Sequence, residues 1–334
     1  MLDDRKANIL KAVVEEYIET AQPVGSGHVS RKPSVNVSPA TVRNELVALE
    51  HDGYLMQPHT SAGRIPTDKG YRFFVDSLHD PGRLAGADAQ QIRTFFARAH
   101  GELEQMLRDT SQLLSQVTDY AAVVVGPPHE QSTIRGVQMV GLAPRLALLV
   151  VVLSNGVIEK HTLDLKEETD DAALAAATSR LSRSLIGTSV AGIHLVGFEG
   201  PAAKDVLVQS AIEVLRTAQQ GTATDPVYIG GASALAASFD AVAQVSEVLR
   251  ILEQQFVVVT LLRDVLDRGL NVAIGAETGI GPLADCALVV APFQAEGETV
   301  GTIGVLGPTR MNYQQALAAV AVVSQRLGDR LSEG

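Results

Sequence analysis

The chain contains 334 residues, of which 46% are hydrophobic and 19% are charged. That length predicts two or three domains, and the composition supports a packed core and excludes a disordered chain. The single cysteine, Cys286, excludes an intramolecular disulfide, which fits a reducing cytoplasm. The longest aliphatic run, Leu146–Leu153, is too short for a membrane-spanning helix of ~20 residues. The first residues lack the apolar core of a signal peptide, so we expect a cytoplasmic protein with no membrane contact.

The formal net charge of −11 argues against a nucleic-acid partner, but the acidity is unevenly distributed. Residues 26–72 contain six basic and four acidic side chains, so this segment is slightly basic. So modest a basic segment predicts few phosphate contacts per copy, and two copies would be needed for useful affinity.

The first two predicted helices cover residues 5–19 and 26–32. Apolar residues recur every three to four positions through the first, which is the pattern of an amphipathic helix. Pro23 follows it, and Ser26 is placed to cap the second helix.

A third helix is predicted over residues 38–52. Serine is a favoured N-cap, and proline is tolerated at the first helical position, so Ser38 and Pro39 mark its start. Its apolar face is formed by Val42, Leu46 and Leu49.

A short hairpin follows, formed by Tyr54–Gln57 and Arg64–Pro66, with Gly63 in the turn. Thr67 then caps a fourth helix, and Asp80-Pro81-Gly82 marks a linker. Three short helices followed by a hairpin is the order of a winged helix.

The remaining chain alternates helical and strand-like patterns. A long helix is predicted over 88–118, and the later helices over 170–186, 203–219, 242–266 and 312–331. Strands are predicted over 120–126, 133–142, 145–153, 157–165, 271–276, 285–293 and 300–307, and a short strand or a turn over 226–231. We interpret this region as one antiparallel α+β domain with a helical insertion.

The pair of helices at 26–32 and 38–52 is the best candidate functional site. A recognition helix enters the major groove with its N-terminal residues at the base edges. The residues at that end are Ser38, Ala40, Thr41, Arg43 and Asn44. Arginine can bind guanine and asparagine can bind adenine through paired hydrogen bonds, and alanine or threonine methyls can pack on thymine. The hairpin adds a small-residue tip with His59, Ser61 and Arg64, which suits a minor groove or a phosphate backbone.

Several segments resemble one known family. They are Pro23–Ser26, Ser38–Leu46, Leu49–Leu55, Gln57–Arg72 and, near the other end, Gly301–Tyr313. These segments bracket nearly the whole chain and resemble the HrcA family of heat-inducible transcription repressors.

The resemblance implies a dimer that represses chaperone operons by binding an inverted repeat called CIRCE, with its active fold maintained by the GroE chaperonin. It implies a multi-domain α+β fold: a winged helix-turn-helix at 1–80, a GAF-like α/β domain at 88–165 and 265–334, and a mainly helical dimerisation domain inserted at 166–264. Many members carry a basic residue where this chain has Gly27, so His28 or Arg31 is expected to replace that phosphate contact. The full set of expected DNA contacts is Ser26, His28, Arg31, Ser38, Ala40, Thr41, Arg43, Asn44, His59, Ser61, Arg64 and Lys69.

Other patterns do not predict a catalytic, metal or cofactor site. The eight histidines have no zinc-ligand spacing. The glycines at 301, 304 and 307 lack the Gly-Lys-Ser/Thr of a phosphate loop. Cys286 lies in an apolar run and is expected to be a buried hydrophobe, and the acidic run at 167–171 is expected to be a solvated helix entry.

Two other functions stay open at the level of sequence. A different winged-helix repressor would sense a metabolite through the body, and a small molecule would then shift its operator affinity. A GAF-type enzyme or signalling module would show no salt-dependent DNA binding and would need a catalytic set, which the sequence does not display.

Overall fold

The computed structural model describes residues 2–59, 62–78, 82, 84–98, 103–127, 132–154, 157–196, 205–220, 225–237, 242–269, 271–295 and 297–332. The chain divides into two compact units. The first contains Met1–Arg98, Thr110–Val124 and Ile229–Gly334, and the second contains Ala99–Asp109 and Val125–Tyr228. None of the helices in the described ranges combines the length and the hydropathy that a membrane crossing requires.

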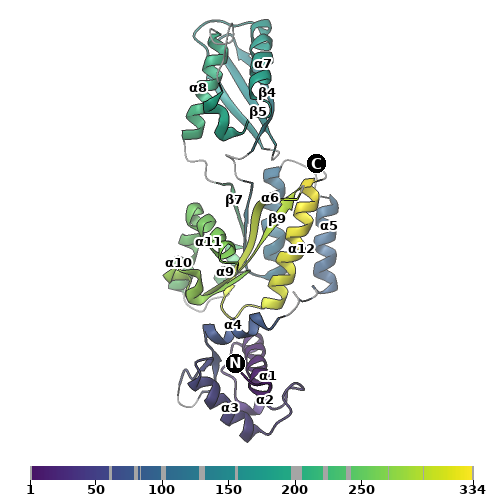
Figure 1. Ribbon diagram of the computed structural model, residues 1–334, viewed down its shortest axis with the longest axis vertical. Helices are drawn as coiled ribbons and strands as arrows, with labels where there is room; N and C mark the ends of the chain where they lie inside the picture. Colours follow the sequence, from purple (N-terminus) through teal and green to yellow (C-terminus); the bar gives the residue numbers. More distant parts are fainter. Residues whose placement is uncertain are drawn as a thin grey trace. The chain divides into compact units, whose positions relative to one another are not determined.

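The first unit begins with a small group of helices and a hairpin (Figure 1). Its elements are α1 (Asp4–Thr20), α2 (Ser26–Val29), α3 (Pro39–His51), β1 (Leu55–Met56), β2 (Ile65–Pro66) and α4 (Asp68–Asp76). The side chains of Asp3, Ser38 and Thr67 cap α1, α3 and α4 by accepting a hydrogen bond from a first-turn amide. The predicted caps Ser38 and Thr67 are therefore confirmed.

Helix α2 is shorter than the sequence pattern predicts. It ends at Val29, and Gly25 occupies its N-cap position, so the assignment of Ser26 as the cap was wrong. The chain continues from α2 in separate turns, in which the Arg31 and Lys32 amides bond carbonyls only three residues back. Such short-range bonds mark a tightened chain that does not propagate an α-helix.

A five-stranded sheet forms the centre of the first unit, with strand order β7-β3-β10-β9-β8. The strands are β3 (Ala121–Val125), β7 (Val227–Gly230), β8 (Val272–Ile274), β9 (Cys286–Ala295) and β10 (Glu298–Pro308). Strand β9 pairs antiparallel with both β10 and β8.

Helices pack around this sheet. Helix α12 (Tyr313–Ser332) lies along β9, with α5 (Gly86–Arg98) beside it (Figure 1). Gly328 permits this close packing, because a Cβ atom there would lie only 2.2 Å from the Gln294 carbonyl oxygen. The other helices are α6 (Leu103–Thr118), α9 (Ala232–Ala237), α10 (Val242–Glu253), α11 (Gln255–Asp267) and the short 3-10 turns η3 (Gly275–Thr278) and η4 (Gly281–Leu283).

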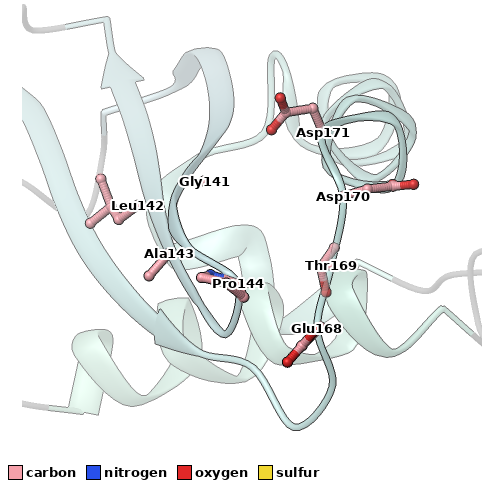
Figure 2. Close-up of a pocket in the computed structure, with 8 residues that line it drawn as sticks. All are labelled: Gly141, Leu142, Ala143, Pro144, Glu168, Thr169, Asp170 and Asp171. Carbon is pink, nitrogen blue, oxygen red and sulfur yellow. The ribbon is translucent and has the colours of Figure 1, made fainter.

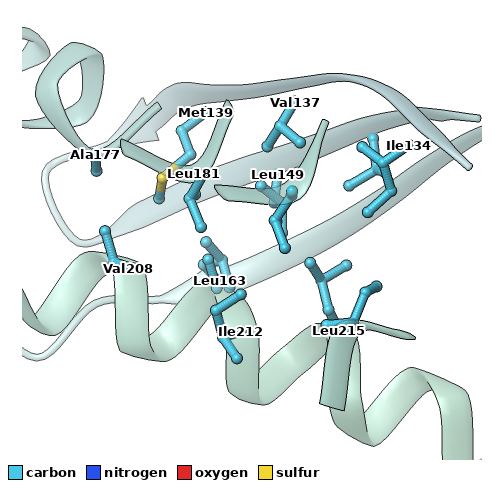
Figure 3. Close-up of a cluster of buried hydrophobic side chains, with 14 of the residues drawn as sticks. Ile134, Val137, Met139, Leu149, Leu163, Ala177, Leu181, Val208, Ile212 and Leu215 are labelled. Carbon is cyan, nitrogen blue, oxygen red and sulfur yellow. The ribbon is translucent and has the colours of Figure 1, made fainter. Parts of the chain in front are cut away.

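The second unit is built on a three-stranded antiparallel sheet of order β4-β5-β6. Its elements are β4 (Ile134–Ala143), β5 (Leu146–Leu153), β6 (Ile158–Asp164), α7 (Asp171–Leu185), η1 (Val190–Leu195) and α8 (Val206–Gln220). Aliphatic side chains from one face of the sheet and from both α-helices form a single core (Figure 3). Burial of this shared apolar surface explains why these elements form one compact unit.

The strands predicted to form one antiparallel domain thus fall into two sheets. β4, β5 and β6 lie in one unit with α7 and α8, whereas α10 and α11 belong to the other unit. The predicted helix 88–118 contains two helices, α5 and α6, and the predicted helix 242–266 breaks at Gln254, which leaves the helical conformation (φ −86°, ψ 80°). No glycine or proline marks that break in the sequence.

Candidate nucleic-acid interface

Helix α3 presents two opposite faces. Val42, Leu46 and Leu49 are buried, at 0%, 5% and 0% exposure, and pack into the N-terminal group of helices. The opposite face is solvent-exposed along the whole helix and is formed by Ala40, Arg43, Asn44, Val47 and His51. In an α-helix, residues three and four apart are neighbours, so these side chains form one continuous stripe.

The start of α3 is held by its own cap. The Ser38 hydroxyl accepts the Thr41 amide (3.2 Å) and lies 3.0 Å from the Thr41 hydroxyl. Both predicted contact residues therefore stabilise the helix end, while Ala40, Arg43 and Asn44 are exposed. The free amides of the first turn, with the helix dipole, make this end a favourable neighbour for an anion such as a phosphate.

The acidic residues of α3 are turned away from the stripe and paired. Glu45 lies 3.7 Å from Arg5 of α1, and Glu50 lies 2.8 Å from Arg64. The exposed stripe itself carries no carboxylate. A nucleic-acid backbone approaching this stripe would therefore meet Arg43 without direct acidic repulsion.

Residues around α2 provide further exposed groups. His28 and Arg31 are exposed and Ser26 is half-buried. Lys32 is instead bound to Glu16 of α1 at 2.8 Å, and its hydrogen bond lowers the pKa of the Glu16 carboxyl and raises the pKa of the Lys32 ammonium. Lys32 is therefore used to hold this segment against α1, whereas the Arg31 side chain is exposed to solvent.

Arg64, the arginine of the hairpin, is bound to other residues of the protein. The backbone of Arg64 exchanges two 2.9 Å hydrogen bonds with Val24, and its side chain is only 15% exposed because it reaches Glu50. Gly63 is required for this approach, because a Cβ atom there would lie 2.5 Å from the Val24 backbone. His59 is exposed, and Ser61 lies outside the described residues. A DNA role for Arg64 would require it to leave Glu50.

Lys69, also an expected contact, is engaged at the other end of α3. Its ammonium donates to the Asp52 carbonyl (2.8 Å) and lies 4.3 Å from the centre of the Tyr54 ring. A cation at a helix C-terminus is stabilised by the helix dipole, so Lys69 serves to hold α4 against the end of α3.

Sequence reasoning missed a junction between α4 and the five-stranded sheet. Arg72 donates from Nε to Glu277 of η3 (2.9 Å) and from Nη2 to the second Glu277 oxygen and to the Val272 carbonyl (2.8 Å). Asp68 accepts the Ala276 amide at 3.1 Å. Asp68 and Arg72, one helical turn apart on α4, thus both bind the short turn η3. We call these contacts the α4–η3 junction.

Electrostatics of the α4–η3 junction favour the charged pair. Burial alone would raise the pKa of Glu277, but the hydrogen bonds from Arg72 and from the Ile274 amide lower it overall. Gly275 adopts a left-handed φ of +54°, and a Cβ atom there would lie 2.2 Å from the Asp68 carboxylate. Only glycine fits both that conformation and that contact.

The same helix carries a buried tyrosine against the C-terminal helix. The rings of Tyr71 and Tyr313 lie 6.0 Å apart, and both residues are at most 2% exposed. Burial raises the pKa of the Tyr71 hydroxyl, which has no hydrogen-bond partner among the described residues. In the sequence, the Asp-Lys-Gly-Tyr-Arg run at 68–72 signalled this region, but its partners lie some 200 positions away and gave no local signal.

The second unit contains a pocket that lacks the exposed basic groups of the α3 stripe. It has a volume of about 490 Å³ and lies between the β4–β5 turn and the start of α7 (Figure 2). Asp170 points away from it and caps α7, whereas Asp171 points toward β4. Its acidic lining is unsuited to phosphate. Within the described ranges, no three histidine, cysteine or acidic side chains are grouped to hold a metal ion.

Comparisons with known proteins identify the family of this chain. The family described as HrcA protein C terminal domain matches residues 104–317. A heat-inducible transcription repressor HrcA from Pelotomaculum thermopropionicum is 36% identical over 99% of this chain and 97% of its own. The HrcA repressor of Cutibacterium acnes is 37% identical, with 100% of each chain covered. These matches define the class, transcription repressors rather than enzymes.

The chain belongs to the HrcA family, since the family match covers more than half of its length and full-length relatives exceed 30% identity. A solved structure described as a hypothetical protein shares the fold, with a TM-score of 0.71, 22% identity, and 100% and 99% of the two chains covered. The resemblance in the sequence motifs is thereby confirmed.

Proposed function

We propose that this protein represses heat-shock chaperone operons by binding an inverted-repeat operator of the CIRCE type as a homodimer in the cytoplasm. The observation that carries the proposal is the exposed stripe of α3, in which Arg43 and Asn44 face solvent opposite a fully buried face. Their side chains make no hydrogen bond or ion pair within the described ranges, so both are available to bind base edges.

The order of elements supports a winged helix-turn-helix at residues 1–80. α2 and α3 follow α1, and the β1–β2 hairpin with its exposed His59 follows α3. In this arrangement α3 is the recognition helix and the hairpin is the wing. Ser26, His28 and Arg31 are assigned to the flanking phosphates, with Ala40 packing on a base.

A dimer is supported by charge and by the second unit. One copy offers few exposed basic groups near α3, so a second copy on the same DNA is needed to raise the affinity. On the open face of its sheet, central strand β5 presents only aliphatic residues, Leu146, Leu148, Val150 and Val152. On the flanking strands, Val140 and Ile158 extend this apolar face, and each is 42% exposed. Strands apolar on both faces are typical of sheets covered on both sides, so we assign this face to the dimer contact.

The body is proposed to be GAF-like, with the dimerisation unit inserted into it, and to perform no chemistry of its own. The chaperonin GroE is proposed to maintain the folded repressor, as the family resemblance implies. Unfolded clients produced by heat would then compete for GroE, and the fraction of folded, DNA-bound repressor would fall by mass action.

The test is a gel shift of the full-length protein on a duplex carrying the inverted repeat of a chaperone promoter, with and without GroE. Arg43→Ala and Asn44→Ala should each weaken specific binding by ~1–3 kcal/mol. Glu168→Ala, far from α3 in sequence and on the pocket of the second unit, is the control and should bind like wild type. Normal binding by both α3 variants would refute the recognition-helix assignment. A shift caused by a small metabolite would instead favour a metabolite-responsive repressor.

A further inference from the structure

Val47 is exposed in the middle of the α3 stripe. Its relative exposure is 52%, whereas the other large aliphatic residues of this helix, Val42, Leu46 and Leu49, are at most 5% exposed. Val47 lies three and four positions after Asn44 and Arg43. At 100° per residue its direction falls between theirs, so it continues their surface by one helical turn.

The helix itself gives no reason for valine at this position. Valine is a weaker helix former than alanine, because its branched side chain loses rotamer freedom against the preceding turn. About half of its surface stays exposed in the free protein, so it gains much less from burial than Val42, Leu46 and Leu49 do. The remaining advantage is a stiff, apolar surface, since one χ1 rotamer dominates for valine in a helix.

We infer that Val47 packs on the C5-methyl group of a thymine in the major groove and so determines specificity at one operator base pair. This inference rests on the proposed function, because it takes α3 to be the recognition helix. The major groove presents that methyl only at A·T pairs. An exposed aliphatic group flanked by a guanidinium and an amide matches a base edge, where a methyl lies among hydrogen-bonding groups.

The position of Val47 also constrains how α3 lies on DNA. Val47 is eight residues after Pro39, the first residue of α3, which is ~12 Å along the axis at 1.5 Å per residue. The major groove is itself ~12 Å wide. Val47 therefore reaches a base only if α3 lies lengthwise in the groove and does not enter end-on. One turn of helix is ~5.4 Å and one base-pair step is ~3.4 Å, which places the thymine one or two base pairs from those read by Arg43 and Asn44.

The experiment removes the methyl groups from the DNA one at a time. Full-length wild type and Val47→Ala are titrated against duplexes carrying the CIRCE-type inverted repeat, in which each thymine is replaced in turn by uracil. At one position per half-site, uracil should weaken wild-type binding about fourfold, the value expected for one buried methyl-sized group. Val47→Ala should bind the thymine and uracil duplexes equally at that position, and should respond like wild type at all others.

Two controls keep the result specific. Val206→Ala makes the same change at a valine of 58% exposure in the second unit, and its uracil profile should match wild type. Circular dichroism should show that Val47→Ala unfolds no earlier than wild type, because alanine favours helix.

The possible failures are distinct. If Arg43→Ala and Asn44→Ala weaken binding but no uracil duplex separates Val47→Ala from wild type, the Val47 contact is refuted and the proposed function stands. If Arg43→Ala and Asn44→Ala also bind normally, α3 is not the recognition helix, and both assignments fall.

Discussion

Replacing Glu277 with glutamine should weaken the α4–η3 junction without changing its shape. Glu277 accepts two hydrogen bonds from the Arg72 guanidinium and one from the Ile274 amide. Hydrogen bonds to charged groups contribute ~1.5–3 kcal/mol and neutral ones ~0.5–1.5 kcal/mol. Arg72 keeps the Val272 carbonyl and Asp76 as partners, so the variant should lose about 2 kcal/mol rather than the ~3–5 kcal/mol of a fully orphaned buried charge.

The sign of the pH dependence follows from the lowered pKa of Glu277. Its carboxyl has an ordinary pKa of 4.5, and the folded value lies below that. The stabilisation is therefore fully present above the unfolded pKa and is lost as the pH falls through the folded pKa. Wild type and Glu277→Gln should differ most at neutral pH, and the difference should shrink as the pH falls below the ordinary pKa of 4.5 and through the lower folded pKa.

The assay is unfolding in urea, monitored by far-ultraviolet circular dichroism, at neutral pH and in acid. Asp264→Asn is the control, because Asp264 forms an exposed ion pair with Arg268 and such pairs contribute ~0–1 kcal/mol. A loss below about 0.5 kcal/mol for Glu277→Gln at neutral pH, or a difference that persists unchanged in acid, would refute the energetic role given to this junction.

Three other outcomes are expected. Gly70→Ala should lower the melting temperature, because its Cβ atom would lie 2.2 Å from the Tyr54 carbonyl oxygen, whereas Gly27→Ala should not, because nothing lies within 4 Å of that position. Burial raises the pKa of the Cys286 thiol to about 12, so iodoacetamide should leave the native protein unmodified at about pH 8 and label it in urea; labelling of the native protein would contradict its burial. Leu148→Glu should convert the proposed dimer to monomer in light scattering while preserving the circular dichroism spectrum, and an unchanged mass would remove the open sheet face from the dimer contact.

Local signals in the sequence were sufficient to predict α1, α3, the hairpin and α4. A capping serine or threonine and an apolar period identify a helix from neighbouring residues alone, as Ser38 and Thr67 show. The failed cap at Ser26 shows the limit, because a single residue can occupy either the N-cap or the first helical position.

The partners of the basic residues were not predictable in this way. Arg64 and Lys69 are both bound at the C-terminal end of α3, through Glu50 and the Asp52 carbonyl, whereas Arg72 is bound by Glu277 of η3. Charge pairing is decided by tertiary structure, and sequence spacing reports it only within one helix. Basic residues counted as DNA contacts from sequence therefore included two that are engaged inside the protein.

The sequence patterns did not show that the strands fall into separate sheets, for a related reason. A strand pattern records which faces are apolar and does not record which neighbour supplies the hydrogen bonds. β4, β5 and β6 have the alternation of ordinary antiparallel strands, and only their shared core with α7 and α8 separates them from the larger sheet.

A single residue, Thr67, separates β2 from helix α4, which begins at Asp68 and is bonded to η3 within its first two turns. No slack chain therefore separates the hairpin from the large sheet at this point. A DNA-binding domain on a flexible linker can reach half-sites at many separations. A domain fixed to the large sheet through α4 and η3 is expected to move together with that sheet. If the protein binds its operator as the proposed dimer, any tolerance to changes in operator spacing must come from a part of the molecule other than residues 67–72.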